Sequence, residues 1–417
     1  MTPGTLRSIQ GVHRAPATSS GILFMPIALL ALTLSAFAIG TTEFVIVGLV
    51  PTIASDLGVS LPSAGLLVSL YALGVAVGAP LLTAATSRFN RKWVLMALMT
   101  LFIIGNLLAW QAPGYNSLIV ARLLTGLAHG VFFSIGSTIA TSLVSKDREA
   151  SAIAIMFTGL TVALVTGVPL GTWIGQHLGW RATFLVVSLL GTIALIGSAL
   201  LIPRNLKRAA PASIAQQVRV LTHPRLLLVY AMTILGYGGT FTAFTFLAPI
   251  LEQVTGFDSS VVALIMLVYG ASVAVGNLYG GRLADRLGAT SALSWVFAGL
   301  SIVLALLTFT AGHAIAAVIT ILVWGAFAFG NVPGLQVYVV QLAERYVPEG
   351  VDIASGLNIA AFNIGIALGS IIGGQVVTHL RLTDTAWIGA IIVLSALAAT
   401  RFSARLDQRR ELRLAGV

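Results

Sequence analysis

The chain contains no cysteine, which excludes disulfide bonds, thiol chemistry and cysteine-ligated metal sites. Charged side chains are also scarce: Asp, Glu, Lys and Arg make up 9% of its 417 residues, whereas soluble proteins carry roughly a quarter. No G-x-x-x-x-G-K-S/T phosphate loop occurs, so a process driven by ATP is not expected. We expect neither a metal ion nor an organic cofactor.

Long apolar stretches take the place of charge. Hydrophobic residues make up 57% of the chain, and a bilayer core of about 30 Å is crossed by about 20 apolar residues in a helix. Because backbone groups in lipid must bond within their own segment, we expect these stretches to be helices of an all-α membrane protein. The twelve predicted spans are residues 23–52, 62–86, 93–111, 116–143, 152–177, 182–202, 226–251, 260–284, 292–311, 314–342, 352–379 and 383–402.

Basic residues are distributed unevenly between the loops. The formal net charge is +10, yet only Arg181 and Arg381 fall on one predicted side of the membrane, and the other loop arginines and lysines fall on the opposite side. Loops rich in Lys and Arg stay in the cytoplasm, which predicts cytoplasmic termini in a multi-pass protein of the inner membrane. A groove for nucleic acid would need basic residues clustered with aromatic ones, and no such cluster occurs.

A repeat at a constant offset of 198 residues divides the chain. The matched positions are Gly40, Thr42, Pro51 and Gly58, recurring as Gly238, Thr240, Pro249 and Gly256; Gly167, Gly171 and Gly175, recurring as Gly365, Gly369 and Gly373; and Tyr71, recurring as Tyr269. A constant offset over most of a half-chain indicates two copies of one unit. Two pseudo-symmetric six-helix bundles around a site at the membrane midplane are a transporter architecture.

The repeat and the composition also set domain boundaries. We predict a disordered N-terminus at 1–21, bundles at 22–202 and 226–403, a linker at 203–225 and a basic tail at 404–417. Within the linker, the sequence from Ser213 to Leu221 is compatible either with a short surface helix or with plain connecting chain.

The loop after the second span of each bundle carries a shared motif. The C-terminal copy has Gly281, Asp285 and Arg286, while the N-terminal copy has Arg88 and Arg91 but lacks the acidic residue. This motif resembles the G-x-x-x-D-R-x-G-R-K loop signature of the major facilitator superfamily, over a chain length from about residue 23 to 402. The resemblance implies that these residues contact neighbouring helix ends and hold one gate state. The alternative is that the arginines only fix the topology.

The fifth span contains Gly159, Gly167, Pro169 and Gly171. Glycines on one helix face let another backbone approach closely, and a proline inside a helix kinks it. The pattern resembles the G-x(7)-G-x-P-x-G-G signature of drug:proton antiporters, except that Thr172 replaces the last glycine. Helix packing alone would also account for the glycines.

Two charges fall inside predicted spans: Glu43 in the first and Arg122 in the fourth. A charge at such depth in the membrane costs a few kcal/mol of free energy, and such charges usually have a function. Arg122 opens a sequence similar to the fourth-helix arginine signature of the superfamily, and Gly-Thr-Thr-Glu-Phe around Glu43 is similar to arabinose or sugar efflux and chloramphenicol-export permeases. The resemblance implies that Glu43 carries the proton and that Arg122 tunes its protonation. His129, two turns beyond Arg122, is a candidate relay.

The repeat pairs Glu43 with Phe241 and Arg122 with Thr320, so the second copy lacks both charges. A purely structural charge would more plausibly survive in both copies, although a satisfied structural ion pair is the alternative. The C-terminal half offers amides instead. Gln336, Asn358 and Asn363 are the predicted substrate-cavity residues; the alternative is that they hydrogen-bond helices to one another.

These features predict a secondary transporter, and the resemblance implies proton-coupled export of a small molecule such as a sugar, nucleoside or drug. The expected partners are that substrate, protons and the lipid bilayer, with the protein acting as a monomer. A proton-coupled uptake symporter is the first alternative, and a non-transporting membrane sensor is the second. An enzyme is not expected, because Ser137 and His129 are separated by about 12 Å along one helix, too far for a nucleophile and its base.

Overall fold

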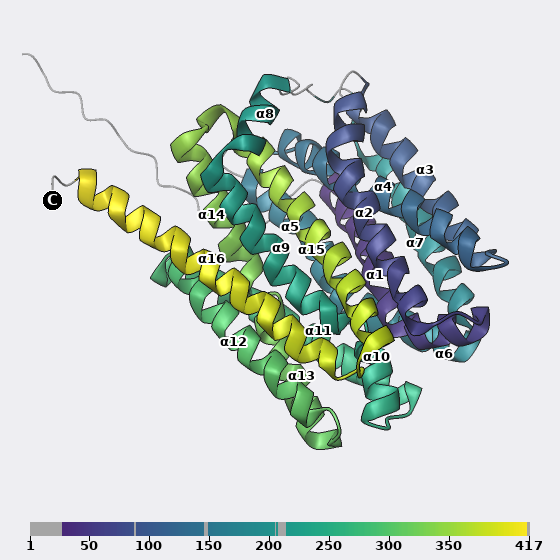
Figure 1. Cartoon of the computed structure of the whole chain (residues 1–417). Coiled ribbons are helices and arrows are strands. Elements are labelled where there is room, and N and C mark those ends of the chain that lie inside the picture. The colour runs from purple at the N-terminus through teal and green to yellow at the C-terminus, as the bar shows by residue number, and fades with distance from the viewer. Residues whose placement is uncertain (1–26, 87–88, 146–148, 205, 207–213, 415–417) are drawn as a thin grey trace, which may run out of the picture.

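The computed structural model describes residues 27–86, 89–145, 149–204, 206 and 214–414. Within these residues all regular structure is helical, and twelve segments are long and apolar enough to cross a membrane (Figure 1). The predicted all-α class and the twelve spans are therefore confirmed. The predicted disordered segment 1–21 lies outside the described residues.

The first six spans follow one another along the chain. They are α1 (Ile27–Leu57), α2 (Leu61–Thr86), α3 (Arg91–Trp110), α4 (Tyr115–Ser142), the composite α5 (Glu149–Val162), η2 (Ala163–Gly167) and α6 (Val168–Leu178), and α7 (Trp180–Leu201). Among them, α2 packs on α4, while α3 packs on α4 and α7. The fifth span is interrupted by one π-helical turn, η2, which ends two residues before Pro169. A proline cannot donate the regular helical hydrogen bond, and a wider turn accommodates that loss.

The second six spans repeat this order with different interruptions. They are α9 (Pro224–Phe244) with α10 (Leu247–Pro249) and the π turn η3 (Ile250–Val254), α11 (Ser259–Leu287), α12 (Ala289–Thr310), α13 (Ala314–Ala328) with α14 (Asn331–Tyr346), α15 (Val351–His379) and α16 (Asp384–Leu414). A short 3-10 turn, η4 (Pro348–Gly350), precedes α15. Between the two sets lies the linker helix α8 (Ile214–Thr222), which is the short surface helix left open by the sequence.

The helix α8 marks one end of the molecule, which we call the linker face. There α8 packs against α9 and α15, and its Arg219 forms an ion pair of 3.3 Å with Glu349 of η4. Both the start of α9 and the end of α16 lie at this face (Figure 1). The end where α10 and α6 lie is the opposite face.

The two sets of helices pack against each other along α2 and α15. The Ser370 hydroxyl of α15 donates to the Gly65 carbonyl of α2 at 2.9 Å. Gly65 also makes room for Phe246, because a Cβ at this glycine would lie 2.8 Å from the phenyl ring. Phe44 of α1 and Phe241 of α9 continue the interface, with ring centroids 6.3 Å apart. The contact between the halves is therefore mainly apolar.

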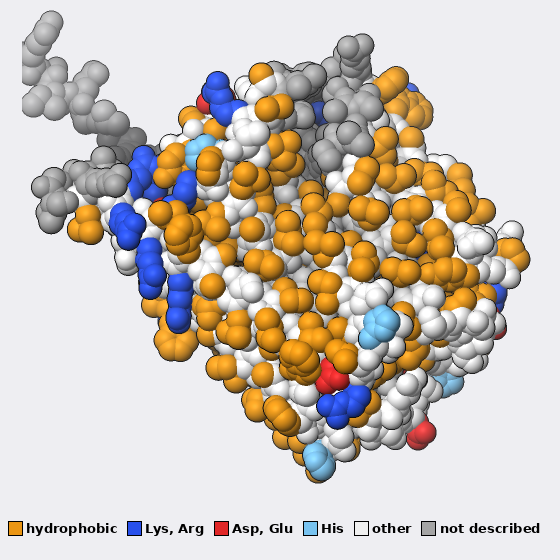
Figure 2. Space-filling model, in the orientation of Figure 1, with side chains coloured by type: hydrophobic (Ala, Val, Ile, Leu, Met, Phe, Trp, Pro, Cys, Tyr) orange, Lys and Arg blue, Asp and Glu red, His pale blue; other side chains and the backbone are white. Residues whose placement is uncertain are grey.

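Two helices run further than the sequence predicts. Helix α1 continues through Pro51 to Leu57 rather than ending near residue 52. Helix α16 continues to Leu414, whereas the predicted span ends at 402 and the remainder was expected to be a basic tail. Hydropathy locates the part of a helix that lies in lipid, and a helix that leaves the membrane gives no such signal. Between the linker face and the opposite face, the surface of the molecule carries a wide belt of apolar side chains (Figure 2).

Candidate functional site

Glu43 lies in the middle of α1, where the two halves meet. Its side chain is 7% exposed, and the next residue, Phe44, packs against Phe241 of α9 and Phe329, with ring centroids 6.3 and 6.2 Å away. One carboxylate oxygen of Glu43 lies 3.8 Å from Nδ1 of His129 on α4. The acid that the sequence singles out is therefore buried at the contact between the bundles.

Tyr71 of α2 completes this cluster. Its hydroxyl lies 2.9 Å from Nδ1 of His129. The Arg122 guanidinium lies over its ring in a cation–π contact, 4.1 Å from the ring centroid. The same imidazole nitrogen thus faces a phenol and a carboxylate, two groups that exchange protons. The sequence offered Tyr71 only as a repeat match to Tyr269, because an isolated tyrosine in an apolar span gives no chemical signal.

Arg122 is bound to the cluster by hydrogen bonds to backbone carbonyl groups rather than by an ion pair with the Glu43 carboxylate. Its guanidinium donates to the carbonyl oxygens of Thr42 at 2.7 Å and Glu43 at 3.4 Å, and its Nε donates to the carbonyl of Leu67 at 3.2 Å. Among the described residues no ion pair joins Arg122 to the Glu43 carboxylate. The fork of donors on arginine suits carbonyl acceptors on two helices, since each carbonyl has a second lone pair beyond its helical bond. Arg122 therefore holds α1 to α2 and places its charge beside Glu43.

A second polar contact fixes the same turn of α1 on its other side. The Thr42 hydroxyl donates to Oδ1 of Asn106 at 2.7 Å, and Asn106 donates to the carbonyl of Phe102 at 2.9 Å. Both side chains are fully buried. Sequence reasoning did not select Asn106, although it is an amide inside a predicted span. The turn that carries Glu43 is consequently held by α3 as well as by α4.

The glycines of the fifth span form a seam against α1. A Cβ at Gly171 would lie 2.6 Å from a Val45 methyl group, and a Cβ at Gly159 or Gly167 would overlap atoms of α1. The α1 residues that fill these positions are Thr33, Thr41 and Val45. Their separations of eight and four residues place them on one face of α1, and Thr41 and Val45 stand two residues before and after Glu43.

The π turn η2 lies at this seam and also touches the other half. Gly270 of α11 leaves room for it, because a Cβ there would overlap the Leu164 carbonyl and lie 2.9 Å from Cα of Val165. Single π turns inside helices are common at functional sites. Here the turn links the helix that carries Glu43 to a helix of the second bundle.

The amides of the C-terminal half form a chain of hydrogen bonds. Thr233 donates to Asn358 at 2.7 Å, Asn358 donates to Gln336 at 3.0 Å, and Gln336 donates to Ser355. Asn363 stands apart: its amide nitrogen bonds the carbonyl of Ile359 in its own helix at 3.0 Å. Its Oδ1 is buried and has no partner among the described residues. The structure thus joins two of the three predicted cavity residues, and leaves Asn363 with an unused acceptor.

Comparison with known proteins places this geometry in a family. The family model described as Major Facilitator Superfamily matches residues 32–347. The chain belongs to this superfamily. The superfamily member from Bacillus subtilis named as the uncharacterized transporter YtbD is 53% identical over 92% of this chain and 96% of its own length. The inner membrane transport protein YdhP of Escherichia coli K12 is 40% identical over 90% and 96%, and the putative transporter AraJ of the same strain 32% identical over 92% and 96%.

Solved structures show the same superfamily fold. A bacterial homologue of the human lysosomal transporter Spinster, crystallised in an inward-facing and occupied conformation, superposes with a TM-score of 0.75 at 17% sequence identity. The alignment covers 90% of this chain and 96% of that one. The protein is a multi-pass membrane transporter of the major facilitator superfamily, which moves its substrate by alternating access of two bundles to the two sides of the membrane.

The superfamily loop motif differs between the two bundles. Arg88 lies outside the described residues. Asn90 caps α3 by accepting from the backbone of Lys92 at 3.0 Å, and Lys92 donates to the Ala199 carbonyl at the end of α7 at 2.7 Å. Arg91 is buried beside them, at 9% exposure. This loop therefore ties α3 to α7, within one bundle.

In the second bundle the motif residues are more open. Asp285 and Arg286 are exposed. Neither side chain forms a hydrogen bond or an ion pair with another of the described residues. A Cβ at Gly281 would meet only Pro333, at 3.7 Å, so close packing does not require this glycine. Gly288 ends α11 and starts α12 with a φ of 79°. The gating role of Asp285 stays a prediction.

Proposed function

We propose that this transporter exports a small, neutral or weakly polar molecule in exchange for protons, with Glu43 as the proton carrier. The observation that carries the proposal is the position of Glu43. The carboxyl group is buried in the first bundle, touches His129, and lies next to the aromatic contact with the second bundle. A proton on this group therefore changes the charge at the surface that opens and closes.

The coupling follows from the cost of burial. An ionised carboxylate is costly to bury against apolar rings, whereas a protonated one is far less so. Protonated Glu43 thus favours the arrangement in which Phe44 packs on Phe241, and ionised Glu43 favours an arrangement in which water reaches it. A proton can shift the equilibrium only by this difference in interaction energy between the two states.

The neighbours of Glu43 have distinct roles in this scheme. Arg122 holds its charge beside the site through carbonyl oxygens on two helices, so its position does not depend on the protonation of Glu43. His129 and Tyr71, joined at 2.9 Å, form a path along which a proton reaches or leaves the carboxylate. The π turn η2 before Pro169 supplies the flexible point that lets α1 and α11 change contact.

The substrate side of the proposal rests on the second bundle. Gln336, Asn358 and Asn363 offer amide donors and acceptors without charge, and the unused Oδ1 of Asn363 is the acceptor available for a ligand. Tyr237 and Phe362, with ring centroids 4.5 Å apart, add an aromatic wall near the interface. This combination suits a neutral polar molecule such as a sugar, a nucleoside or an uncharged drug.

The test uses everted membrane vesicles in which respiration acidifies the interior, with acridine orange as the pH probe. Addition of sugars, nucleosides and antibiotics in turn should identify a compound that releases protons with the wild type. Glu43→Gln should abolish that release and keep substrate binding or exchange. Asp258→Asn, which changes an exposed carboxyl without a capping bond in the same way, should behave as the wild type. If Glu43→Gln releases protons normally, the carrier lies elsewhere and His129 is the next candidate.

Orientation is part of the proposal, and it is tested separately. The basic loops lie at the linker face, so we place this face and both termini in the cytoplasm, in the bacterial inner membrane. A reporter that is active only in the periplasm should be inactive when fused after Val417 and active when inserted after Arg381. An active reporter at Val417 would overturn the orientation and with it the direction of transport.

A further inference from the structure

Helix α16 has two different faces at the linker face of the molecule. Beyond the apolar span it continues as a polar helix to Leu414. Ser403 and Asp407 point inward, with Ser403 fully buried, whereas Arg401, Arg405 and Arg409 are exposed. Residues four apart lie on one side of a helix, so the three arginines form a single stripe.

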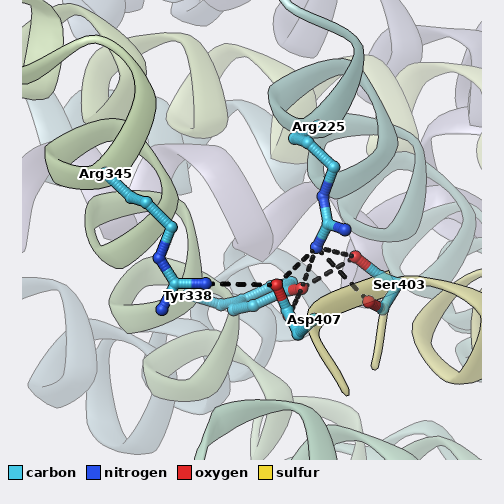
Figure 3. Close-up of polar contacts among 5 residues, drawn as sticks. All are labelled: Arg225, Tyr338, Arg345, Ser403 and Asp407. Atoms are coloured by element: carbon cyan, nitrogen blue, oxygen red, sulfur yellow. Dashed lines mark hydrogen bonds and ion pairs between the residues drawn. The ribbon is translucent and has the colours of Figure 1, made fainter. Parts of the chain in front are cut away.

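The inward face fixes how the helix is rotated. Asp407 accepts from Arg225 of α9 at 2.9 Å and from the Tyr338 hydroxyl of α14 at 2.7 Å, and it lies 3.3 Å from Arg345 (Figure 3). The Ser403 hydroxyl lies 2.7 Å from that of Tyr338. These contacts join three helices, and they keep the arginine stripe turned away from the protein.

The stripe lies over an apolar floor. Along one side of α16, Arg401 and Arg405 border an open, shallow groove of about 300 Å³ together with Leu394, Leu397, Ala398 and Phe402, all of them residues of this one helix. Phe402 is 56% exposed and Leu394 49%. Figure 2 shows basic side chains gathered along the same edge of the molecule, directly beside the apolar belt. The groove therefore passes from apolar at Leu394 to cationic at Arg405 within about three helical turns.

The cations of this stripe have no acidic partner among the ion pairs of the described residues. Asp407, which stands two residues from both Arg405 and Arg409, is engaged on the opposite face by Arg225 and Arg345. Three like charges on one stripe repel each other, and an external anion would relieve that repulsion.

We infer that this groove binds one anionic phospholipid from the leaflet at the linker face. Arg401 and Arg405 hold the phosphate and Arg409 adds to the local positive potential, while an acyl chain lies along Leu394 and Ala398. A soluble anion would use the arginines and leave the apolar floor exposed; only an amphiphile fills both parts. Basic sites at the ends of membrane helices are suited to anionic head groups.

The experiment is native mass spectrometry of the purified full-length protein in detergent, titrated with dioleoylphosphatidylglycerol or with dioleoylphosphatidylcholine. The triple variant Arg401→Gln, Arg405→Gln, Arg409→Gln should retain about tenfold less phosphatidylglycerol than the wild type, with phosphatidylcholine unchanged. The matched control is Arg219→Gln, Arg282→Gln, Arg381→Gln, which removes the same charge at exposed positions and should retain phosphatidylglycerol normally.

Two further arms keep the result interpretable. The triple lysine variant at 401, 405 and 409 should regain most of the retention, which separates lost charge from a misfolded helix. Glycerol phosphate, which is the head group without acyl chains, should compete poorly at concentrations that match the lipid. Equal retention in the glutamine and wild-type proteins, an equal loss in the control, or full competition by glycerol phosphate would each overturn the lipid site.

Discussion

The two bundles share a scaffold and differ in what they bury at equivalent positions. In the first bundle the residues are Glu43, Arg122, His129 and Tyr71; at the offset of 198 residues the second bundle has Phe241, Thr320, Phe327 and Tyr269. Tyr71 contacts an imidazole and a guanidinium. Tyr269 packs on Phe244 and Trp324 with ring centroids 5.1 and 5.5 Å away, and its hydroxyl has no partner among the described residues. At these positions the first copy buries ionisable side chains, and the second copy has mainly aromatic ones.

The irregular turns differ between the bundles in the same way. The first bundle has its π turn in the fifth span, at 163–167, whereas the equivalent part of α15 is a regular helix. The second bundle has its π turn directly after Pro249, whereas the equivalent Pro51 lies inside a continuous α1. The turn η2 touches α11 of the other half, and η3 directly follows α10, which touches α1 of the other half. The repeat therefore preserves the helix order, while each copy bends at its own point.

The largest expected effect comes from removing the charge that only the first bundle has. Glu43→Gln should lower transport driven by a proton gradient by about 100-fold or more, because the neutral amide cannot bind or release a proton. Exchange of labelled for unlabelled substrate across proteoliposomes, without a gradient, should persist. Phe241→Leu, at the equivalent position of the second bundle, should keep coupling. Loss of coupling in Phe241→Leu alone would contradict the assignment of proton chemistry to one copy.

The next largest effect is expected at Arg122. Arg122→Ala should destabilise the first bundle by about 3 kcal/mol, because hydrogen bonds to a charged donor are lost from two helices. Thermal unfolding in detergent should show a lower midpoint and transport should fall. Arg122→Lys keeps the charge without the fork of donors, so it should recover part of the activity but little of the stability. Recovery of both would show that charge alone matters at this position.

A matched tyrosine pair gives a smaller and sharper comparison. Tyr71→Phe removes one hydrogen bond worth about 1 kcal/mol and should slow coupled transport about fivefold. Tyr269→Phe removes a buried hydroxyl without a partner and should leave transport unchanged with equal or higher thermal stability. Initial rates in vesicles at several pH values test both variants. Equal losses in the two variants would remove Tyr71 from the proton path.

The smallest effect is expected at the π turn. Pro169→Ala should lower the transport rate about threefold at normal expression, because alanine lets the fifth span become a regular helix. Pro51→Ala, in a helix that is already continuous, is the control and should change the rate less. Wild-type rates in Pro169→Ala would show that the glycine and proline motif serves packing alone.

Much of this fold was predictable because hydrophobic length and a constant offset both survive in the sequence. The twelve spans follow from the first, and the two-bundle order follows from the second. Through its resemblance to the superfamily, the sequence also implied that Arg122 tunes the protonation of Glu43. It did not indicate that Arg122 binds carbonyl groups of Thr42 and Leu67, because backbone acceptors are present at every residue and carry no sequence signal.

Other features required side-chain geometry or chain continuity. Asn106 and Tyr71 reach the site from α3 and α2, and no spacing rule within one helix connects them to Glu43. The end of α16 was interpreted as a basic tail because its composition is polar. Its helical structure is stabilised by Asp407, which bonds Arg225 from a helix 182 residues earlier in the chain. A contact between residues so far apart in the chain cannot be predicted from the pattern of neighbouring residues.

Gly288 has a consequence for how the second bundle is made. It is the single residue between α11 and α12, with φ 79° and ψ 154°, a conformation that costs other residues about 1–3 kcal/mol. With so short a connection, neither helix can settle in the bilayer far from the other during synthesis. The two should therefore enter as one hairpin, and replacing Gly288 should reduce the yield of inserted protein more than the stability of protein already in the membrane.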